Sequence, residues 1–284
     1  MEIKRPALYI VGTPIGNLED MSPRGIFTLK EVDFIAAEDT RVTAKLLNAF
    51  DIKKPLVSYY EHNIRDRGIE IINRLKNGEC CALVTDAGMP AISDPGEDLV
   101  KLCASEDIPV FAVPGPSAVI AALAISGLST GRFTFEGFLS KAGKTRRQHL
   151  EEIKNEKRTM VFYEAPHKLM DTLNDLLMAL GDRNVSIARE MTKIHEEVIR
   201  TTLSGAIQIF KDKKPKGEFV LVIEGAKTEE KPLYDIENPE LRQSIKDKVI
   251  NLVERGLTKK EAIKKVALEY NLKRNQVYEI CFKK

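Results

Sequence analysis

The chain has 284 residues, a net charge of +2, 43% hydrophobic residues and 30% charged residues, which is an ordinary globular composition. This length allows two domains with cores of their own. The most apolar helical segment, "AVIAALAI" at 118–125, is far shorter than the roughly 20 residues of a membrane span. The N-terminal apolar run is too short for a signal peptide. These features favour a cytoplasmic protein over a membrane or secreted one.

Short apolar runs alternate with helical patterns along the chain. Several runs show no polar alternation, which is typical of strands buried on both faces, so we expect a largely parallel α/β sheet. In "HKLMDTLNDLLMALG", leucines recur on one helical stripe and Gly181 is suited to end the helix. The predicted strands are 7–11, 34–37, 81–85, 109–113, 159–163, 184–188, 197–203 and 218–225.

The predicted strands fall into two groups, and the second group restarts at Thr159 after "VPGPSA". We therefore predict an α/β domain at 1–115, a second α/β domain at 116–228 and a charged linker at 229–240. The segment 241–284 has twelve Lys and Arg against five Asp and Glu, a net charge of +7. Thr258 and Glu261 have the spacing of a capping box, and a turn leads into another short helix. A small helix-turn-helix-like module is expected there.

Glycines and polar residues gather after the predicted strands. The stretches are "GTPIGNLED", "EDTR", "TDAGMPAISDPG", "PGPSA", "YEAPH" and "ARE". Any one of them could be a turn or a helix cap, and Asp39 or Thr40 could simply cap the helix that follows. In open α/β sheets, however, ligands bind at the carboxyl ends of the strands. Six such loops together indicate a ligand cleft.

The first of these loops is not a dinucleotide-binding fingerprint. That fingerprint needs G-x-G-x-x-G, so that backbone N–H groups can approach a pyrophosphate. Here Pro14 stands at the second glycine position, and proline has no N–H to donate. We interpret the loop as a rigid turn that bounds a small-molecule pocket.

Metal binding is not expected. The four cysteines lack metal-ligand spacing and are expected to be reduced thiols in or near cores. The "HEE" stretch at 195–197 starts a predicted strand, where neighbouring side chains point to opposite faces. The cysteines are Cys80, Cys81, Cys103 and Cys281.

Between residues 4 and 225 the motifs carry a family resemblance. "GTPIGNLEDMSPRG", "AEDTR", "TDAGMPAISDPG", "VPGPSA", "GFL", "YEAPHKL", "AREMTKIHEE" and "GEFVLVIEG" follow one another in that order. The chain resembles the tetrapyrrole-methylase-like (class III) S-adenosylmethionine methyltransferases, and within them the branch that methylates small-subunit rRNA. The resemblance implies two α/β domains with S-adenosylmethionine in the cleft between them, and a homodimer. It also implies 2′-O-methylation of a cytidine ribose in 16S rRNA, near the decoding site of the 30S subunit.

Three positions depart from the family pattern. Met89 stands where Thr is usual, Ser140 where Pro is usual, and Lys168 where Arg is usual. The first substitution could alter a cofactor contact. Lys168 keeps the positive charge of the usual Arg but lacks the planar guanidinium that can donate two hydrogen bonds to one carboxylate or phosphate. The glycines and the Asp86 carboxylate are retained, so we still expect activity.

The resemblance also implies which residues hold the cofactor. Pro14 and Ile15 would line its methyl end, and the "DAGM" residues would lie beside its methionine and ribose parts. "PGPSA" would contact its carboxylate, while Tyr163 and Ala188 would border the adenine. Tyr163 could instead be a core aromatic. The implied set is Pro14, Ile15, Asp86, Gly88, Met89, Ser117, Ala118, Tyr163 and Ala188.

A ribose hydroxyl is a weak acid, so a positioned base would assist its methylation. Glu38, Asp39 and His167 are the candidates, and Arg41 could hold a phosphate. Asn17 and Asp20 are expected to point toward RNA. RNA binding also needs basic contacts. The exposed basic loop predicted before the next helix would supply Lys141, Lys144, Arg146 and Arg147.

Two other functions compete with rRNA methylation. An enzyme of the same fold could act on a tetrapyrrole or a protein side chain, and it would not need the basic loop and tail. A non-catalytic RNA-binding relative would bind no cofactor. The product that carries a labelled methyl group would distinguish the three.

Overall fold

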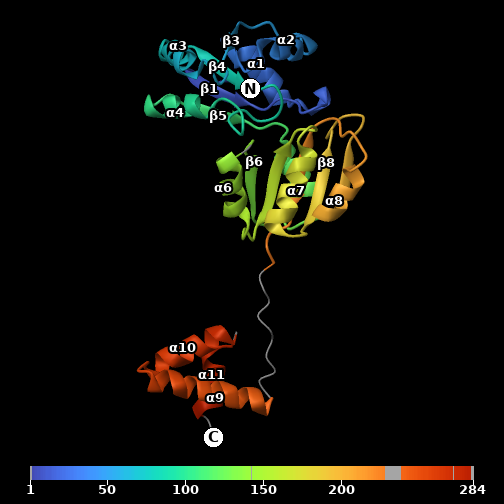
Figure 1. Ribbon diagram of the computed structural model, residues 1–284. Coiled ribbons are helices and arrows are strands. Elements are labelled where there is room, and N and C mark those ends of the chain that lie inside the picture. The colour runs from blue at the N-terminus through green and yellow to red at the C-terminus, as the bar shows by residue number, and fades with distance from the viewer. Residues whose placement is uncertain (1, 142, 228–237, 271, 283–284) are drawn as a thin grey trace. The chain divides into compact units, whose positions relative to one another are not determined.

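The computed structural model describes residues 2–141, 143–227, 238–270 and 272–282. The chain divides into two compact units, Met1–Ala226 and Lys227–Lys284. The first unit contains two five-stranded sheets with helices against them, and the second contains helices (Figure 1). The expectation of two consecutive α/β sheets followed by a helical module is therefore confirmed.

The first sheet is parallel throughout, with the strand order β3–β2–β4–β1–β5. Its strands are β1 Ala7–Val11, β2 Phe34–Ala37, β3 Leu56–Ser58, β4 Cys80–Val84 and β5 Val110–Val113. Its helices are α1 Pro23–Glu31, α2 Thr40–Ala49, α3 Ile64–Lys76 and α4 Glu97–Ser105, with a short 3-10 helix η1 at Leu18–Asp20.

Helices cover both faces of this first sheet. Leu29 of α1 and Leu47 of α2 pack on one face. Ile71 of α3 and Leu99 of α4 pack on the other face. Because β1, β2 and β4 are buried on both faces, their sequences are continuous apolar runs. These runs made the three strands predictable from the sequence.

The second sheet has the strand order β6–β7–β10–β8–β9. Its strands are β6 Phe133–Phe138, β7 Thr159–Glu164, β8 Asn184–Arg189, β9 Glu197–Thr202 and β10 Phe219–Ile223. Its helices are α5 Ala118–Ile125, α6 Gly143–Ile153, α7 Leu169–Leu180 and α8 Leu203–Phe210. As predicted, α7 ends at Gly181, which has a φ of 77°.

The prediction of a largely parallel arrangement is wrong for this second sheet. β10 runs antiparallel to both β7 and β8, and β9 runs antiparallel to β8; β6 and β7 are parallel. The short connection 190–196 between β8 and β9 suits an antiparallel pair, since parallel neighbours need a longer crossover. The apolar runs arise because α5 covers one face and α7 covers the other. Burial on both faces does not reveal strand direction.

Two strands were missed from the sequence. β3 has three residues, all partly exposed. β6 has exposed phenylalanines at both ends, and its register shifts between Phe135 and Gly137. A short or irregular strand with neither a continuous apolar run nor clean alternation gives a weak signal.

The second unit consists of α9 Pro239–Glu254, α10 Lys259–Glu269 and α11 Arg274–Phe282. Ile245, Val266 and Val277, one from each helix, share its core. The predicted capping box is confirmed, because the Thr258 hydroxyl accepts from the Glu261 N–H and the Glu261 carboxylate accepts from the Thr258 N–H. Of the predicted linker 229–240, residues up to 237 lie outside the described residues.

Candidate functional site

The loop that follows β1 is fastened to the loop that follows β4. The Thr13 N–H donates to the Gly88 carbonyl at 2.9 Å, and the Gly88 N–H donates back at 3.1 Å. The buried Thr13 hydroxyl donates to the Thr85 carbonyl at 3.1 Å. These bonds fix the chain immediately before Pro14, and the proline ring restricts φ at the next position, so the loop is held as a turn.

The same loop also touches the loop that follows β5. A Cβ atom on Gly115 would lie 2.8 Å from backbone atoms of Gly12, and one on Gly12 would lie 2.7 Å from the Gly115 Cα. Only glycine allows two backbones to approach so closely. Since β4, β1 and β5 are neighbours in the sheet, their three loops join into one surface.

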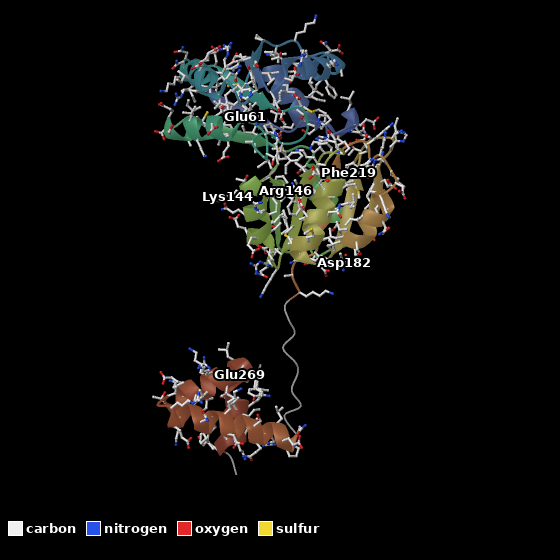
Figure 2. The ribbon with its side chains drawn as sticks, viewed as in Figure 1. Glu61, Lys144, Arg146, Asp182, Phe219 and Glu269 are labelled. Carbon is white, nitrogen blue, oxygen red and sulfur yellow. The ribbon has the colours of Figure 1, made fainter. Side chains whose placement is uncertain are left out.

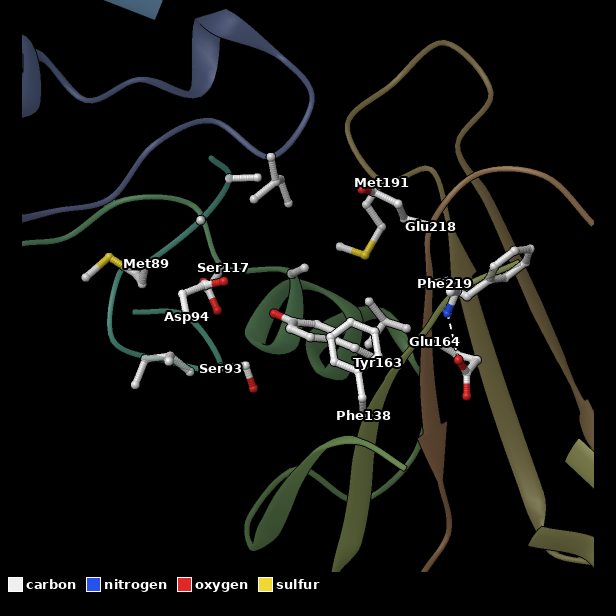
Figure 3. A pocket seen from close by; sticks show the side chains of 18 of the residues that line it. Met89, Ser93, Asp94, Ser117, Phe138, Tyr163, Glu164, Met191, Glu218 and Phe219 are labelled. Carbon is white, nitrogen blue, oxygen red and sulfur yellow. Dashed lines mark hydrogen bonds between the residues drawn. The ribbon is translucent and has the colours of Figure 1, made fainter. Parts of the chain in front are cut away.

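A cavity of about 490 Å³ lies between this surface and the second sheet. Its volume falls within the usual range for a small-molecule site. Figure 3 shows side chains from both sides pointing into it. The first wall consists of Ile15, Gly88, Met89, Ser93, Asp94 and Ser117. The second wall consists of Phe138, Tyr163, His167, Ala188, Met191 and Phe219.

Aromatic side chains dominate the second wall. The Tyr163 ring lies 5.1 Å from the Phe135 ring and 5.6 Å from the Phe138 ring, measured between centroids. Burial raises the pKa of the Tyr163 hydroxyl, and the Asp94 charge adds to this. With the small Ala188 nearby, this wall offers apolar area to a flat heterocycle.

Acidic side chains gather at the first wall. Asp86 and Asp94 belong to the loop after β4 and Glu38 to the loop after β2, and the charges of these carboxylates influence one another. Burial, followed by the charges of Glu38 and Asp86, raises the pKa of Asp94 to about 7. The Thr85 hydroxyl donates to Glu38 at 2.5 Å. Asp94 is the member of this group that lines the cavity.

Asp39 serves as a helix cap, the role that the sequence left open for it. Its carboxylate accepts from the Arg41 N–H at 2.8 Å and pairs with the Arg41 guanidinium at 2.7 Å. These bonds lower the pKa of Asp39 to about 2. The Arg41 side chain is 87% exposed, so it remains accessible to a ligand in solution.

The basic stretch expected to be a loop is largely helical, because α6 begins at Gly143. The Arg146 guanidinium is 12% exposed, and it donates to Asp175 at 2.6 Å, to Thr172 at 3.1 Å and to the Ser140 carbonyl at 3.0 Å. Lys144 and Arg147, by contrast, are exposed (Figure 2 labels Lys144 and Arg146). Arg146 therefore ties α6 to α7.

Most of the residues implied for the cofactor line this cavity. They are Ile15, Gly88, Met89, Ser117, Ala118, Tyr163 and Ala188. Pro14 and Asp86 are not among the lining residues, and Asp86 instead accepts from the Asp39 N–H at 3.2 Å. Of the candidate bases, His167 lines the cavity, whereas Glu38 and Asp39 do not.

Sequence reasoning missed Asp94, Phe138, Met191 and Phe219 as lining residues. Asp94 lies in the "SDPG" part of a motif that had been singled out, but nothing in the spacing set it apart from Asp86. Phe138 belongs to a strand that was not predicted. These residues come together through tertiary structure.

The three departures from the family pattern have different surroundings. Met89 lines the cavity and packs against the first sheet, with its sulfur facing Gly12. Ser140 offers a backbone carbonyl to Arg146, a contact that any residue provides. Lys168 stands at the start of α7 and makes no side-chain cap bond.

The remaining predicted positions lie outside the cavity lining. Asn17 accepts from the Glu19 N–H at 3.0 Å, and both Asn17 and Asp20 are exposed. Glu196 accepts from the Thr192 N–H, and Glu197 pairs with Arg189 at 3.4 Å. Among the described residues, no group of three His, Cys, Asp or Glu side chains could hold a metal. No described helix is long and apolar enough to cross a membrane.

Comparison with known proteins adds sequence relatives. The profile of a family described as Tetrapyrrole (Corrin/Porphyrin) Methylases matches residues 7–207. A Synechocystis sp. protein named ribosomal RNA small subunit methyltransferase I is 48% identical over 274 residues, which is 96% of each chain. A protein of the same name from Thermotoga maritima is 54% identical over 218 residues, covering 77% of this chain and 98% of that protein.

Solved structures share the fold at lower identity. Uroporphyrin-III C-methyltransferase from Thermus thermophilus, complexed with S-adenosylhomocysteine, aligns with a TM-score of 0.55 and 17% identity. The alignment covers 76% of this chain and 96% of that one. Diphthine synthase aligns with a TM-score of 0.56 and 14% identity, over 77% and 90% of the two chains.

Proposed function

Since the chain belongs to the family of tetrapyrrole (corrin/porphyrin) methylases, we propose that it methylates RNA with S-adenosylmethionine. The acceptor is the 2′-hydroxyl of a cytidine ribose in 16S rRNA, near the decoding site. The observation that carries this proposal is the 48–54% identity, over most of the chain, to proteins named for small-subunit rRNA methylation. The solved uroporphyrin-III C-methyltransferase, by contrast, is only 17% identical.

The cavity fits S-adenosylmethionine on physical grounds. Tyr163 and Ala188 offer a flat apolar surface to the adenine, whereas Gly88 and the start of α5 leave backbone open to the polar end. Ile15 would lie near the methyl group. When bound, S-adenosylmethionine supplies an activated methyl group on a sulfonium sulfur. The protein's own task is to position the acceptor oxygen and to accept its proton.

The substrate we propose is 16S rRNA within the 30S subunit, and the chain acts in the cytoplasm. The segment 241–284, with its net charge of +7, suits a phosphate backbone. Other exposed basic side chains suit the phosphate backbone as well, namely Lys141, Lys144, Arg147 and, next to Asp39, Arg41. Asn17 and Asp20 would meet the RNA beside Ile15.

We also propose that the chain works as a homodimer. Helix α5 exposes Ile120 and Ile125, with 54% and 37% of their surface accessible, and Phe133 is exposed nearby in sequence. Contiguous exposed apolar patches mark surfaces that a partner covers, and we propose that these residues belong to such a patch. Light scattering at micromolar concentration should give a mass near twice the 31.9 kDa of one chain.

The reaction is tested with labelled S-adenosylmethionine and three acceptors: 30S subunits from cells lacking this modification, naked 16S rRNA, and a tetrapyrrole. Nucleoside mass spectrometry should find 2′-O-methylcytidine in the rRNA of the subunits. Label that enters only the tetrapyrrole would overturn the proposal. Cofactor binding without transfer to any acceptor would contradict it as well, and absence of cofactor binding would favour a non-catalytic RNA-binding protein.

Substitutions of the neighbouring Arg146 and Arg147 should distinguish an effect on RNA binding from an effect on stability. Arg147→Ala should weaken RNA binding about three- to tenfold, because one phosphate contact is lost. The slope of the logarithm of the binding constant against the logarithm of the salt concentration should become smaller by about one. Its melting temperature should stay within about 1 °C of the parent. Arg146→Ala is the matched comparison, since it leaves Asp175 without its ion-pair partner and should lower the melting temperature by several degrees. Equal effects of the two changes on RNA binding, with both proteins fully folded, would contradict this division.

A further inference from the structure

This inference rests on the proposed function, because methyl transfer to a ribose hydroxyl releases a proton. We infer that Asp94 is the base that accepts this proton. Asp94 lies in the loop between β4 and α4, and its side chain lines the cavity on the first wall. Figure 3 shows its carboxylate facing the hydroxyl end of Tyr163, which projects from the second wall. The carboxylate is therefore placed on the opposite side of the cavity from the aromatic surface that suits the adenine.

The other carboxylates near this loop are engaged elsewhere. Glu38 accepts the Thr85 hydroxyl, and Asp86 accepts the Asp39 N–H; neither of them lines the cavity. Asp39 caps α2 and pairs with Arg41, and the resulting low pKa makes it a poor base. Of these four side chains, Asp94 alone reaches the cavity.

His167 is the remaining candidate among those the sequence indicated. It lines the cavity from the second wall, but its side chain is exposed to solvent. Asp94 is half-buried and held beside a row of other acids. A base in a partly desolvated position is better suited to proton abstraction than one open to bulk water.

The electrostatic surroundings tune Asp94 for this task. Glu38 after β2, Asp86 after β4 and Tyr163 on β7 are the titratable groups that act on it or respond to it. Burial and the two negative charges raise the pKa of Asp94 to about 7, and the Thr85 hydroxyl opposes this in part. A base whose pKa lies near the working pH is the most effective. The other titratable groups that line the cavity are Glu164, His167 and Glu218, all from the second sheet side.

The proposed step balances in atoms and charge. The ribose oxygen forms a bond to the methyl carbon while the carbon–sulfur bond breaks, and the electron pair of that bond stays on sulfur. The hydroxyl proton moves to an Asp94 carboxylate oxygen, which later releases it to water. No further reactant is needed.

The test uses the full-length chain with Asp94→Asn, which keeps the size of the side chain and removes its basicity. Single-turnover methylation of 30S subunits should fall about 100-fold or more, whereas the cofactor dissociation constant from calorimetry should change less than threefold. Asp94→Glu should recover part of the rate. The control is Asp98→Asn, which removes an exposed carboxylate on α4 outside the cavity lining and should leave the rate unchanged.

A pH series completes the test. The parent rate should rise with one ionisation and level off, and that ionisation should be missing from Asp94→Asn. A rate within threefold of the parent, or an unchanged pH profile, would overturn the assignment of Asp94. A cofactor affinity lost in proportion to the rate would overturn it too, since Asp94 would then be a binding residue. If the parent chain methylates no RNA, the proposed function fails instead, so the two failures are distinguishable.

Discussion

The two walls of the cavity come from sheets that are built differently. The first wall is made of loops at the carboxyl ends of parallel strands, where backbones touch and acids gather. The second wall is made largely of side chains on and around β7, β8 and β10, the antiparallel centre of the second sheet, and it is mainly aromatic and apolar. This difference suggests different roles for the two walls. The first wall holds the charged groups and accepts the proton, and the second wall supplies contact area for the adenosine part of the cofactor.

The largest effect is expected where the loops of the first wall touch. Gly115→Ala would place a Cβ atom 2.8 Å from the Gly12 backbone, and backbone atoms cannot move aside as a flexible side chain can. Overpacking of this kind costs about 1–3 kcal/mol of unfolding free energy. We expect cofactor affinity to fall at least about 100-fold, because the loops must separate, and the melting temperature to fall by about 5 °C.

Gly131→Ala is the matched control for this change. A Cβ atom there would have no heavy atom within 4 Å, and the residue needs no positive φ. Calorimetry and thermal denaturation of both variants make the comparison. If Gly115→Ala binds the cofactor as tightly as Gly131→Ala, the contact between the loops does not shape the first wall.

A smaller effect is expected at the second wall. Tyr163→Ala removes a ring that packs against Phe135 and Phe138 and faces the cavity. We expect a 10- to 30-fold loss of cofactor affinity, which corresponds to about 1.4–2 kcal/mol. Tyr163→Phe keeps the ring and should bind within threefold of the parent. Equal losses in the two variants would assign the contact to the hydroxyl group and not to the aromatic surface.

The smallest effect concerns stability and pH at the first wall. In the folded chain the pKa of Asp94 is raised to about 7 from 3.8, so the carboxyl stays protonated up to a higher pH than in the unfolded chain. The folded state then binds more protons, and its stability falls as the pH rises from about 4 to 7. Asp94→Asn removes this loss and should be more stable than the parent at pH 8.

After allowance for solvent screening of a half-exposed group, the gain is on the order of 1–2 kcal/mol, or about 2–6 °C. Below about pH 4, where the carboxyl is protonated in both the folded and the unfolded chain, the two proteins should melt at nearly the same temperature. Thermal denaturation across this range is independent of catalysis. A constant difference between them at every pH would show that Asp94 has an ordinary pKa.

The sequence predicted the first wall better than the second. β1 and β4 are continuous apolar runs, and glycines with polar residues follow them, so the position of the cleft could be inferred from local pattern. Strand direction in the second sheet could not be inferred, because α5 and α7 bury β10 on both faces and erase its alternation. The strand β6, which carries Phe138, was missed for its irregular register.

Individual roles depended on contacts that no spacing encodes. Arg146 and Arg147 look alike in the sequence, yet only Arg146 reaches Asp175 on α7. Asp86 and Asp94 belong to one motif, but the turn between them sends Asp94 to the cavity and Asp86 to the Asp39 backbone. Such assignments require the tertiary structure.

The central claim, that one S-adenosyl ligand occupies the cavity between the two walls, is tested most directly by a crystal structure with S-adenosylhomocysteine. We predict that the adenine ring lies against Tyr163 and Ala188 and that the sulfur lies on the side of Ile15, with Asp94 facing the space left for the acceptor. Density for the ligand at another site, or a cavity filled only by solvent at saturating ligand, would contradict the account.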